Sequence, residues 1–167
     1  MLLEDVTKQI RAHFSHHPTG DQEAVISHLS SLHLSTKKNP VYILKGFAGT
    51  GKTSLISAYV NMLKADKKNF VLLAPTGRAA KVMGSYAKKQ SLTIHKKIYY
   101  PKNDPNTGRS FVLQQNKHHN TLFIVDEASM IPDRSPDARV FNNRSLLLDL
   151  MTYVYSGKNC KLILVGD

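Results

Sequence analysis

Apolar residues in this chain form short continuous runs that are separated by stretches of helical spacing. Four runs, at 41–44, 70–74, 121–125 and 161–165, are apolar without polar alternation, as strands covered on both faces of a parallel sheet are. Helical spacing lies between some of them, at 54–64, 79–89 and 145–155. This order predicts an α/β fold, in which a mostly parallel sheet carries helices on both faces.

Two helices are predicted before the first strand. The apolar stripe of the first consists of Leu3, Val6, Ile10 and Phe14. The second is expected to begin at Thr19, and the residues it would bury are Val25, Leu29 and Leu32. Two later stretches differ from the rest: 97–120 is turn-rich between apolar flanks and predicts a protruding β-hairpin, and 132–144 predicts a surface loop.

The segment at 46–53 reads Gly-Phe-Ala-Gly-Thr-Gly-Lys-Thr and fits G-x-x-x-x-G-K-[ST], the loop that wraps the phosphates of ATP or GTP. It lies between a predicted strand and a predicted helix, which is the context the motif needs. The glycines aim backbone N–H groups inward, and the helix N-terminus adds positive potential. The alternative is a glycine turn that only caps a helix. The predicted nucleotide-binding residues are Gly46, Ala48, Gly49, Thr50, Gly51, Lys52, Thr53 and Ser54.

Two carboxylates follow the apolar run at 121–125. Asp126 is predicted to hold Mg²⁺ together with the Thr53 hydroxyl, and Lys52 is predicted to contact the β- and γ-phosphates. Glu127 is predicted to polarise the attacking water, which favours hydrolysis over transfer to a small acceptor. Adjacent residues on a strand point to opposite sides, which suits different roles. The alternative is a pair of carboxylates at a solvated strand end.

Composition narrows the class of protein. The chain has 167 residues and a formal charge of +11, which favours polyanionic partners. A single cysteine, Cys160, excludes an internal disulfide and is expected to be a buried thiol. No apolar run approaches the roughly 20 residues of a membrane span, and the N-terminus lacks the profile of a signal peptide. These features predict a soluble, cytoplasmic chain.

Between Asp66 and Asp104 there is no acidic residue, whereas nine residues are Lys or Arg. A solvated helix face explains most lysine-rich runs, but the complete absence of carboxylates also fits a track for a phosphate backbone. His118-His119 has no cysteine or carboxylate company, which argues against a zinc site.

Several blocks together resemble the first motor lobe of the RecD-like superfamily 1 DNA helicases, a RecA-like P-loop NTPase lobe. Besides the phosphate loop, the blocks that match in family order are Ala74-Pro75-Thr76-Gly77-Arg78-Ala79-Ala80-Lys81, Thr93-Ile94-His95, Val125-Asp126-Glu127-Ala128-Ser129-Met130 and Val165-Gly166-Asp167. The resemblance implies ATP and Mg²⁺ as ligands and single-stranded DNA as a partner.

The resemblance also assigns roles to single residues. It places Thr76, Arg78, Ala79 and His95 near DNA, although Thr76 can equally cap a helix and His95 can be structural. It implies that Gln22 recognises adenine; the alternative is that Thr19 and Gln22 form a capping box. The 97–120 hairpin resembles in position a wedge element that parts the duplex in some relatives.

The expected organisation is one domain over 1–167, with N-terminal helices and the adenine motif in 1–36 and the P-loop core in 37–167. The second motor lobe and a γ-phosphate-sensing glutamine are absent, so we expect a truncated lobe with weak NTPase activity alone. Two other functions remain open: a nucleic-acid-binding P-loop module without unwinding activity, and a P-loop kinase for a small metabolite.

Overall fold

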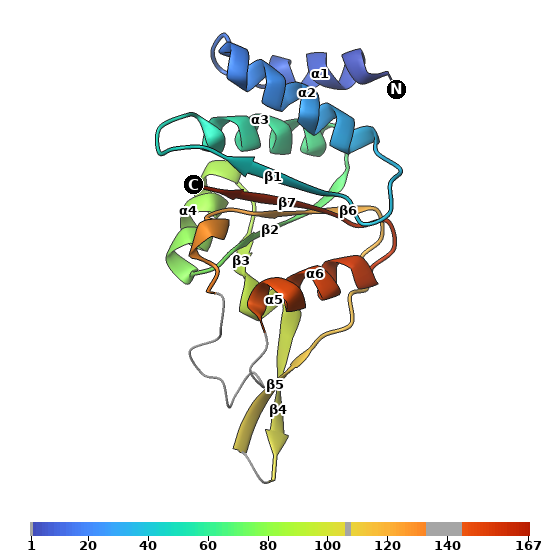
Figure 1. Cartoon of the computed structure of the whole chain (residues 1–167), viewed down its shortest axis with the longest axis vertical. Coiled ribbons are helices and arrows are strands. Elements are labelled where there is room, and N and C mark those ends of the chain that lie inside the picture. Colours follow the sequence, from blue (N-terminus) through green and yellow to red (C-terminus); the bar gives the residue numbers. More distant parts are fainter. Residues whose placement is uncertain (1, 106–107, 133–144) are drawn as a thin grey trace.

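A five-stranded sheet with parallel neighbours throughout forms the centre of the structure, a computed structural model that describes residues 2–105, 108–132 and 145–167. The strand order is β1-β7-β6-β2-β3, and Figure 1 shows the sheet between layers of helices. The strands are β1 (Val41–Lys45), β2 (Asn69–Ala74), β3 (Ser91–Thr93), β6 (Thr121–Val125) and β7 (Lys161–Gly166). This arrangement confirms the predicted RecA-like α/β fold.

Helices cover both faces of this sheet. The helix α3 packs against one face, and the pair α1 and α2 lies outside it; α5 and α6 lie on the other face (Figure 1). The helices are α1 (Leu3–Ala12), α2 (Gly20–Leu34), α3 (Lys52–Ala65), α4 (Gly77–Ala87), α5 (Ile94–Ile98), α6 (Leu146–Ser156) and the 3₁₀ turn η1 (Ala128–Met130). Thr19 caps α2, Thr76 caps α4 and Ser145 caps α6, each through its side-chain oxygen.

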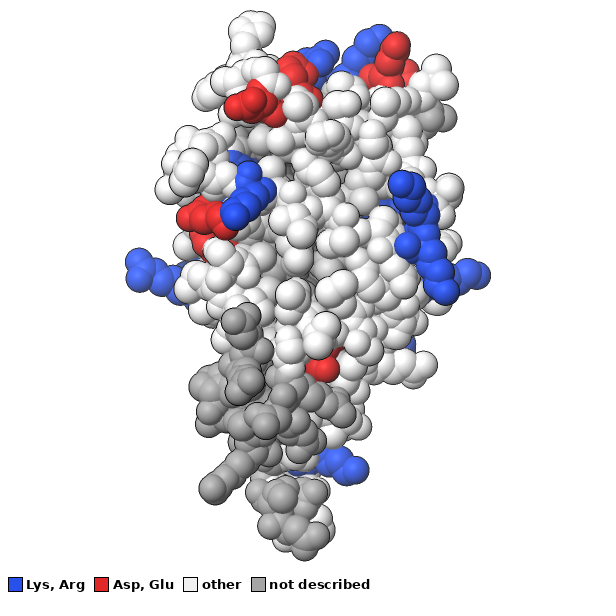
Figure 2. Space-filling view, in the orientation of Figure 1, with Lys and Arg blue, Asp and Glu red and all other residues white. Residues whose placement is uncertain are grey.

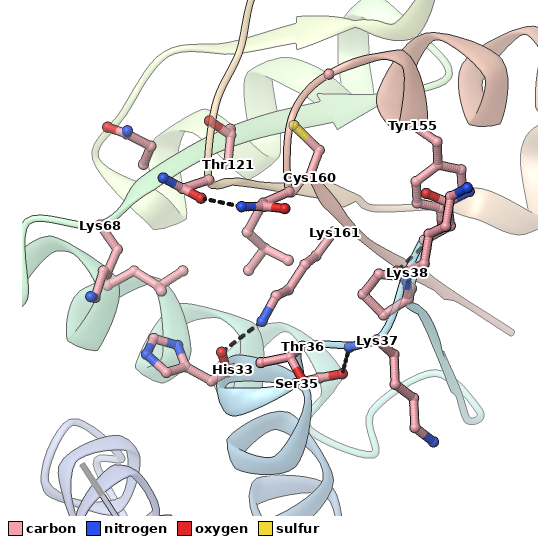
Figure 3. A pocket seen from close by; sticks show the side chains of 18 residues that line it. His33, Ser35, Thr36, Lys37, Lys38, Lys68, Thr121, Tyr155, Cys160 and Lys161 are labelled. Carbon is pink, nitrogen blue, oxygen red and sulfur yellow. Dashed lines mark hydrogen bonds between the residues drawn. The ribbon is translucent and has the colours of Figure 1, made fainter.

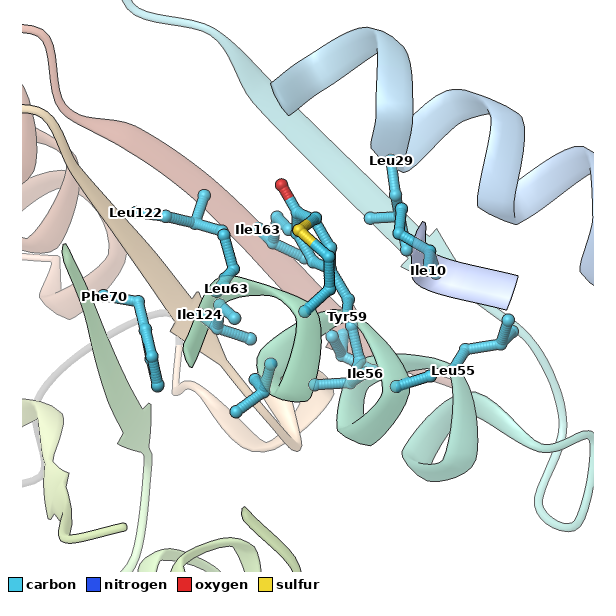
Figure 4. Close-up of a cluster of buried hydrophobic side chains, with 14 of the residues drawn as sticks. Ile10, Leu29, Leu55, Ile56, Tyr59, Leu63, Phe70, Leu122, Ile124 and Ile163 are labelled. Atoms are coloured by element: carbon cyan, nitrogen blue, oxygen red, sulfur yellow. The ribbon is translucent and has the colours of Figure 1, made fainter. Parts of the chain in front are cut away.

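The core is divided by the pleat of the sheet, because successive side chains of a strand point to opposite faces. Leu122 and Ile124 face α3, whereas Phe123 and Val125 face α5 and α6. Figure 4 shows how Tyr59 and Leu63 of α3 fill the space beside the sheet. The central strands are therefore buried on both faces, as their continuous apolar sequences predict. Cys160 is also buried.

The predicted β-hairpin is present and protrudes from the body (Figure 1). It consists of β4 (Tyr99–Asp104) and β5 (Gly108–Leu113), which pair antiparallel. Its base is fixed to the body: the Tyr99 hydroxyl donates to Asp149 Oδ2 of α6 at 2.6 Å, and Gln114 Nε2 donates to the Tyr99 carbonyl at 2.7 Å. The Tyr99–Asp149 bond is buried, so the hairpin is attached to the body at its stem.

The structure differs from the sequence-based expectation at β1, which was predicted to be buried on both faces. This strand is at the edge of the sheet, and Val41 and Ile43 are 44% and 64% exposed. In α2, the fully buried apolar residues are Ile26 and Leu29, with Leu32 nearly so, whereas Val25 is only partly buried. Most of the surface loop predicted at 132–144 lies outside the described residues. Among the described helices, none is long and apolar enough to cross a membrane.

Candidate nucleotide-binding site

The glycine-rich segment forms the connection between β1 and α3, at the carboxyl edge of the sheet. Gly49 and Gly51 have φ values of 80° and 86°, a left-handed conformation that only glycine adopts without strain. Gly51 is also the N-cap of α3, so the N-terminus of this helix opens onto the loop. A helix N-terminus that opens onto a glycine turn can bind an anion, and phosphate binding by this loop stays a prediction.

The lysine of this loop is held by three acceptors. Lys52 Nζ donates to the carbonyl oxygen of Gly46, to that of Phe47 at 3.0 Å, and to Asp167 Oδ1 at 2.6 Å. Lys52 is the first residue of α3 and Asp167 follows β7, so the ion pair connects the start of α3 with the end of β7. The ammonium group therefore lies at the loop, where an oxyanion can be bound.

The two predicted metal ligands lie around one small cavity. Thr53 and Ser57 of α3 line it together with Asp126 and with residues of α4. Asp126 directly follows β6, and its backbone N–H donates to the carbonyl oxygen of Leu73 in β2 at 3.0 Å. A hydroxyl and a carboxylate are the oxygen ligands that Mg²⁺ accepts from protein.

The electrostatics of Asp126 suit a cation. Burial raises the pKa of the Asp126 carboxyl, while a hydrogen bond from the Glu127 N–H and the positive charge of Lys52 act in the opposite direction. The Glu127 N–H lies 3.0 Å from Asp126 Oδ1. A half-buried carboxylate with a raised pKa pays a desolvation cost, which a bound divalent cation would relieve.

Glu127 has a different backbone from the one expected. The sequence prediction placed Asp126 and Glu127 on a strand, where their side chains would point to opposite sides. The strand ends at Val125, and Glu127 has φ 55° and precedes η1, so the alternation argument is wrong here. The Glu127 side chain is exposed.

The end of β7 meets the phosphate loop and η1 through close backbone contacts that the sequence did not reveal. Gly46 N–H donates to the Gly166 carbonyl at 3.2 Å. A Cβ atom at Gly166 would lie 2.9 Å from the backbone nitrogen of Ser129 in η1. Glycine at 166 therefore allows the phosphate loop, η1 and β7 to meet closely. The contact joins residues far apart in sequence and has no local signature.

Gln22 lies against the phosphate loop and also makes the capping box. Its Oε1 accepts from the Thr19 N–H at 3.0 Å, and its own N–H donates to Thr19 Oγ1 at 3.3 Å. In addition, Nε2 donates to the Thr50 carbonyl at 3.2 Å. The capping-box alternative is therefore realised, and the same side chain touches the loop. Contact with adenine stays a prediction.

Three of the four residues predicted to lie near DNA, Thr76, Arg78 and Ala79, are at the N-terminus of α4. The Ala79 N–H donates to Thr76 Oγ1 at 3.2 Å, so Thr76 caps the helix, and Arg78 is exposed. His95 lies apart in α5, where its ring centroid is 5.9 Å from that of Tyr99 and burial lowers its pKa. DNA contact by Thr76, Arg78, Ala79 and His95 stays a prediction.

The basic stretch between Asp66 and Asp104 is in part structural. Lys89 Nζ lies 3.6 Å from the centroid of the Phe70 ring and donates to the Phe70 carbonyl at 3.1 Å. On the face drawn in Figure 2, Lys and Arg side chains form separate groups rather than one continuous patch. Charge alone therefore does not mark out a path for a polyanion on that face.

The sequence is similar to a known domain family and to several known proteins. The profile of the AAA domain family matches residues 19–167. The ATP-dependent RecD2 DNA helicase of Deinococcus radiodurans is 30% identical over 125 residues, which cover 75% of this chain and 15% of the helicase. An uncharacterized protein of Acanthamoeba polyphaga mimivirus is 29% identical over 157 residues, covering 80% of this chain and 31% of that protein.

A third relative is an uncharacterized protein of Methanocaldococcus jannaschii, 30% identical over 141 residues, which cover 78% of this chain and 11% of that protein. The chain thus spans less than a third of the length of each of these relatives. The similarity to RecD2, together with the family match, confirms the resemblance to a RecD-like motor lobe that the sequence blocks predict.

Proposed function

Because this chain belongs to the AAA domain family, we propose that it is the ATP-binding and ATP-hydrolysing lobe of a DNA helicase that acts on single-stranded DNA. The observation that carries this proposal is the meeting of three groups at the carboxyl edge of the sheet. Lys52 is held at the loop, while Thr53 and Asp126 line one cavity beside it. Ligands of open α/β sheets bind at this edge.

Each group has a distinct task in the proposed reaction. The loop N–H groups and Lys52 bind the phosphates, and Thr53 with Asp126 would hold Mg²⁺ and its hydration shell. Mg²⁺ neutralises charge that develops on the phosphate oxygens. Glu127 is proposed to accept a proton from the attacking water, since it follows Asp126 directly and its side chain is exposed to solvent. Gln22, which already touches the loop at Thr50, is proposed to contact the adenine.

A short path links this site to the proposed DNA-binding residues. The Asp126 N–H donates to Leu73 at the end of β2. The chain continues from β2 through Ala74 and Pro75 to Thr76, which caps α4. Thr76 is therefore three residues along the chain from Leu73, which accepts the hydrogen bond from Asp126, and Arg78 and Ala79 follow Thr76 in the first turn of α4. This proximity supports ATP turnover that responds to DNA.

The protruding hairpin of β4 and β5 is proposed to act in strand separation. Because Tyr99 fixes its base to α6, a force applied to β4 and β5 would reach the body of the lobe. We place it as the wedge against a duplex. Unwinding also requires a second motor lobe that closes on the nucleotide and supplies an arginine finger, so the proposed partner is such a lobe in the full-length protein.

Nucleotide and DNA binding can be tested separately on the full-length protein. Lys52→Ala should abolish binding of a fluorescent ATP analogue, whereas Lys8→Ala, an exposed lysine of α1, should leave it unchanged. Arg78→Ala should weaken binding of a single-stranded oligonucleotide, measured by fluorescence anisotropy, about tenfold. Retained ATP affinity in Lys52→Ala would contradict the phosphate-loop assignment. Equal DNA affinity in Arg78→Ala and Lys8→Ala would contradict the DNA contact.

A further inference from the structure

A second cavity lies at the amino-terminal ends of the strands, whereas the phosphate loop follows the carboxyl end of β1. Its volume is about 700 Å³, within the range of roughly 300–1,000 Å³ that small-molecule sites have. It is bounded by the end of α2 at His33, the loop that leads to β1, and the first residues of β2, β6 and β7. Since the phosphate loop follows the carboxyl end of β1, the two sites are separated by the length of the strands.

The lining is rich in cations and hydrogen-bond donors. Four lysines contribute to it, and among the lining residues that the structure describes there is no Asp or Glu. The lysines are Lys37, Lys38, Lys68 and Lys161. Asparagine amides and Ser or Thr hydroxyls make up much of the remaining polar surface. Arginine, whose fork suits planar carboxylates, does not occur in this lining, whereas lysine binds phosphate as a point charge.

Lys161 holds a charge at the centre of this site. Figure 3 shows its side chain crossing the cavity towards the end of α2. Its Nζ donates to the carbonyl oxygens of Leu32 and His33, each at 2.7 Å. An ammonium group has three N–H donors, and these two carbonyls take two of them. Burial lowers the pKa of Lys161, so a neighbouring anion would favour its charged form.

The His33 imidazole also lines this cavity and lies near two of its lysines. Burial lowers the pKa of its imidazole most, and the charges of Lys161 and Lys68 lower it further, while Asp66 acts in the opposite direction. Its Nδ1 also lies 3.3 Å from the Tyr59 hydroxyl of α3. Lysines from two separate segments therefore lie close enough to this ring to disfavour its charged form.

We propose that this cavity binds a small phosphate-bearing anion at a site distinct from the phosphate loop. The volume, the lysines without carboxylate partners in the lining, and the Lys161 ammonium inside it carry this inference. It does not depend on ATP hydrolysis, since no residue of the phosphate loop takes part. The phosphate groups could belong to a free small molecule or to the phosphorylated end of a nucleic acid strand, and the size of the cavity favours the small molecule.

Tripolyphosphate is the probe for the test, and the background is the Lys52→Ala chain, in which binding at the phosphate loop is removed. Histidine ¹³C NMR follows the His33 imidazole through a pH titration. We expect tripolyphosphate to raise the pKa of His33, because an anion beside the ring stabilises its charged form. A 5′-phosphorylated oligonucleotide at the same phosphate concentration is expected to leave the His33 titration unchanged.

The affinity for tripolyphosphate, measured by calorimetry, identifies the contributing residues. The triple variant Lys37→Ala, Lys38→Ala and Lys68→Ala should bind about tenfold more weakly or worse, and it leaves the Lys161 contacts with α2 intact. The matched control removes the same charge from exposed lysines elsewhere: Lys8→Ala, Lys45→Ala and Lys117→Ala. An unchanged His33 titration, equal weakening in both triple variants, or a response to the oligonucleotide alone would overturn the proposal.

Discussion

Lys52 Nζ lies 2.6 Å from Asp167 Oδ1, so the lysine of the phosphate loop is paired with a carboxylate from the end of the neighbouring strand β7. The lysine side chain is 16% exposed and that of the aspartate is 60% exposed. Half-exposed ion pairs contribute little, up to about 1 kcal/mol. The pair is therefore weak enough to exchange for a contact between Lys52 and a phosphate oxygen.

Asp167→Asn should increase the affinity for ATP in the full-length protein. The ion pair competes with the phosphates for Lys52, so its removal is expected to lower the Kd by up to about fivefold. Titration with a fluorescent ATP analogue measures this change, and Glu4→Gln on α1 controls for the loss of one negative charge. Weaker binding in Asp167→Asn would show instead that the carboxylate supports the bound nucleotide.

Glu127→Gln should separate binding from hydrolysis. The amide keeps the size of the side chain but cannot take a proton, so the rate of ATP hydrolysis should fall by roughly 10²–10⁴. The Kd for ATP should stay within about twofold of the parent. Single-turnover hydrolysis and nucleotide titration measure the two quantities. If hydrolysis continues at the parent rate, another residue orients the water.

Tyr99→Phe should destabilise the attachment of the hairpin. The change removes the hydroxyl that donates to the buried Asp149 carboxylate, and the free energy of unfolding should fall by about 1–3 kcal/mol. Urea denaturation measures the loss. The neighbouring Tyr100 is 45% exposed, and Tyr100→Phe should change stability by less than about 0.5 kcal/mol. Equal stability of the two variants would contradict an energetic role of this bond.

Stability should fall on acidification because of three half-buried histidines. Burial is the largest cause of the lowered pKa values of His33, His95 and His118. The unfolded chain therefore binds protons first, and stability is lost as the pH falls below the unfolded pKa, about 6.5, towards the lower folded values. The urea midpoint should be lower at pH 5.5 than at pH 7.5.

The triple variant His33→Asn, His95→Asn and His118→Asn isolates this effect. Its urea midpoint should depend less on pH than that of the parent over the same interval. His17→Asn, at an exposed position before α2, should keep the parent's pH dependence. An equally steep dependence in the triple variant would assign the acid sensitivity to other groups.

Much of the sheet could be predicted from local sequence. The run at 121–125 became β6 with the predicted bounds, because a strand covered on both faces must be apolar at every position. Ser91–Thr93 and Ile94–Ile98 were not predicted as β3 and α5. Three residues and a five-residue helix are too short for a periodic pattern, so tertiary packing determines them.

In the candidate site too, features that depend on adjacent residues could be predicted, whereas contacts between distant residues could not. The phosphate loop could be proposed from its glycines, Lys52 and Thr53, because the chemistry of such a loop depends on adjacent residues. The pairing of Lys52 with Asp167 joins residues 115 positions apart and has no local signal. The exposure of β1 also could not be predicted, because a sequence does not say which strand lies at the edge of the sheet. The left-handed backbone of Glu127 also could not be predicted, because it depends on the turn that leads into η1.

We propose that ATP hydrolysis by this protein responds to single-stranded DNA. The most direct measurement is the steady-state rate of ATP hydrolysis by the full-length protein, with and without a single-stranded oligonucleotide, beside Glu127→Gln. We predict that the oligonucleotide increases the rate severalfold, and that Glu127→Gln lowers the rate by roughly 10²–10⁴ under both conditions. ATP hydrolysis that is the same with and without the oligonucleotide would contradict it, as would phosphate transfer to a small acceptor in place of water.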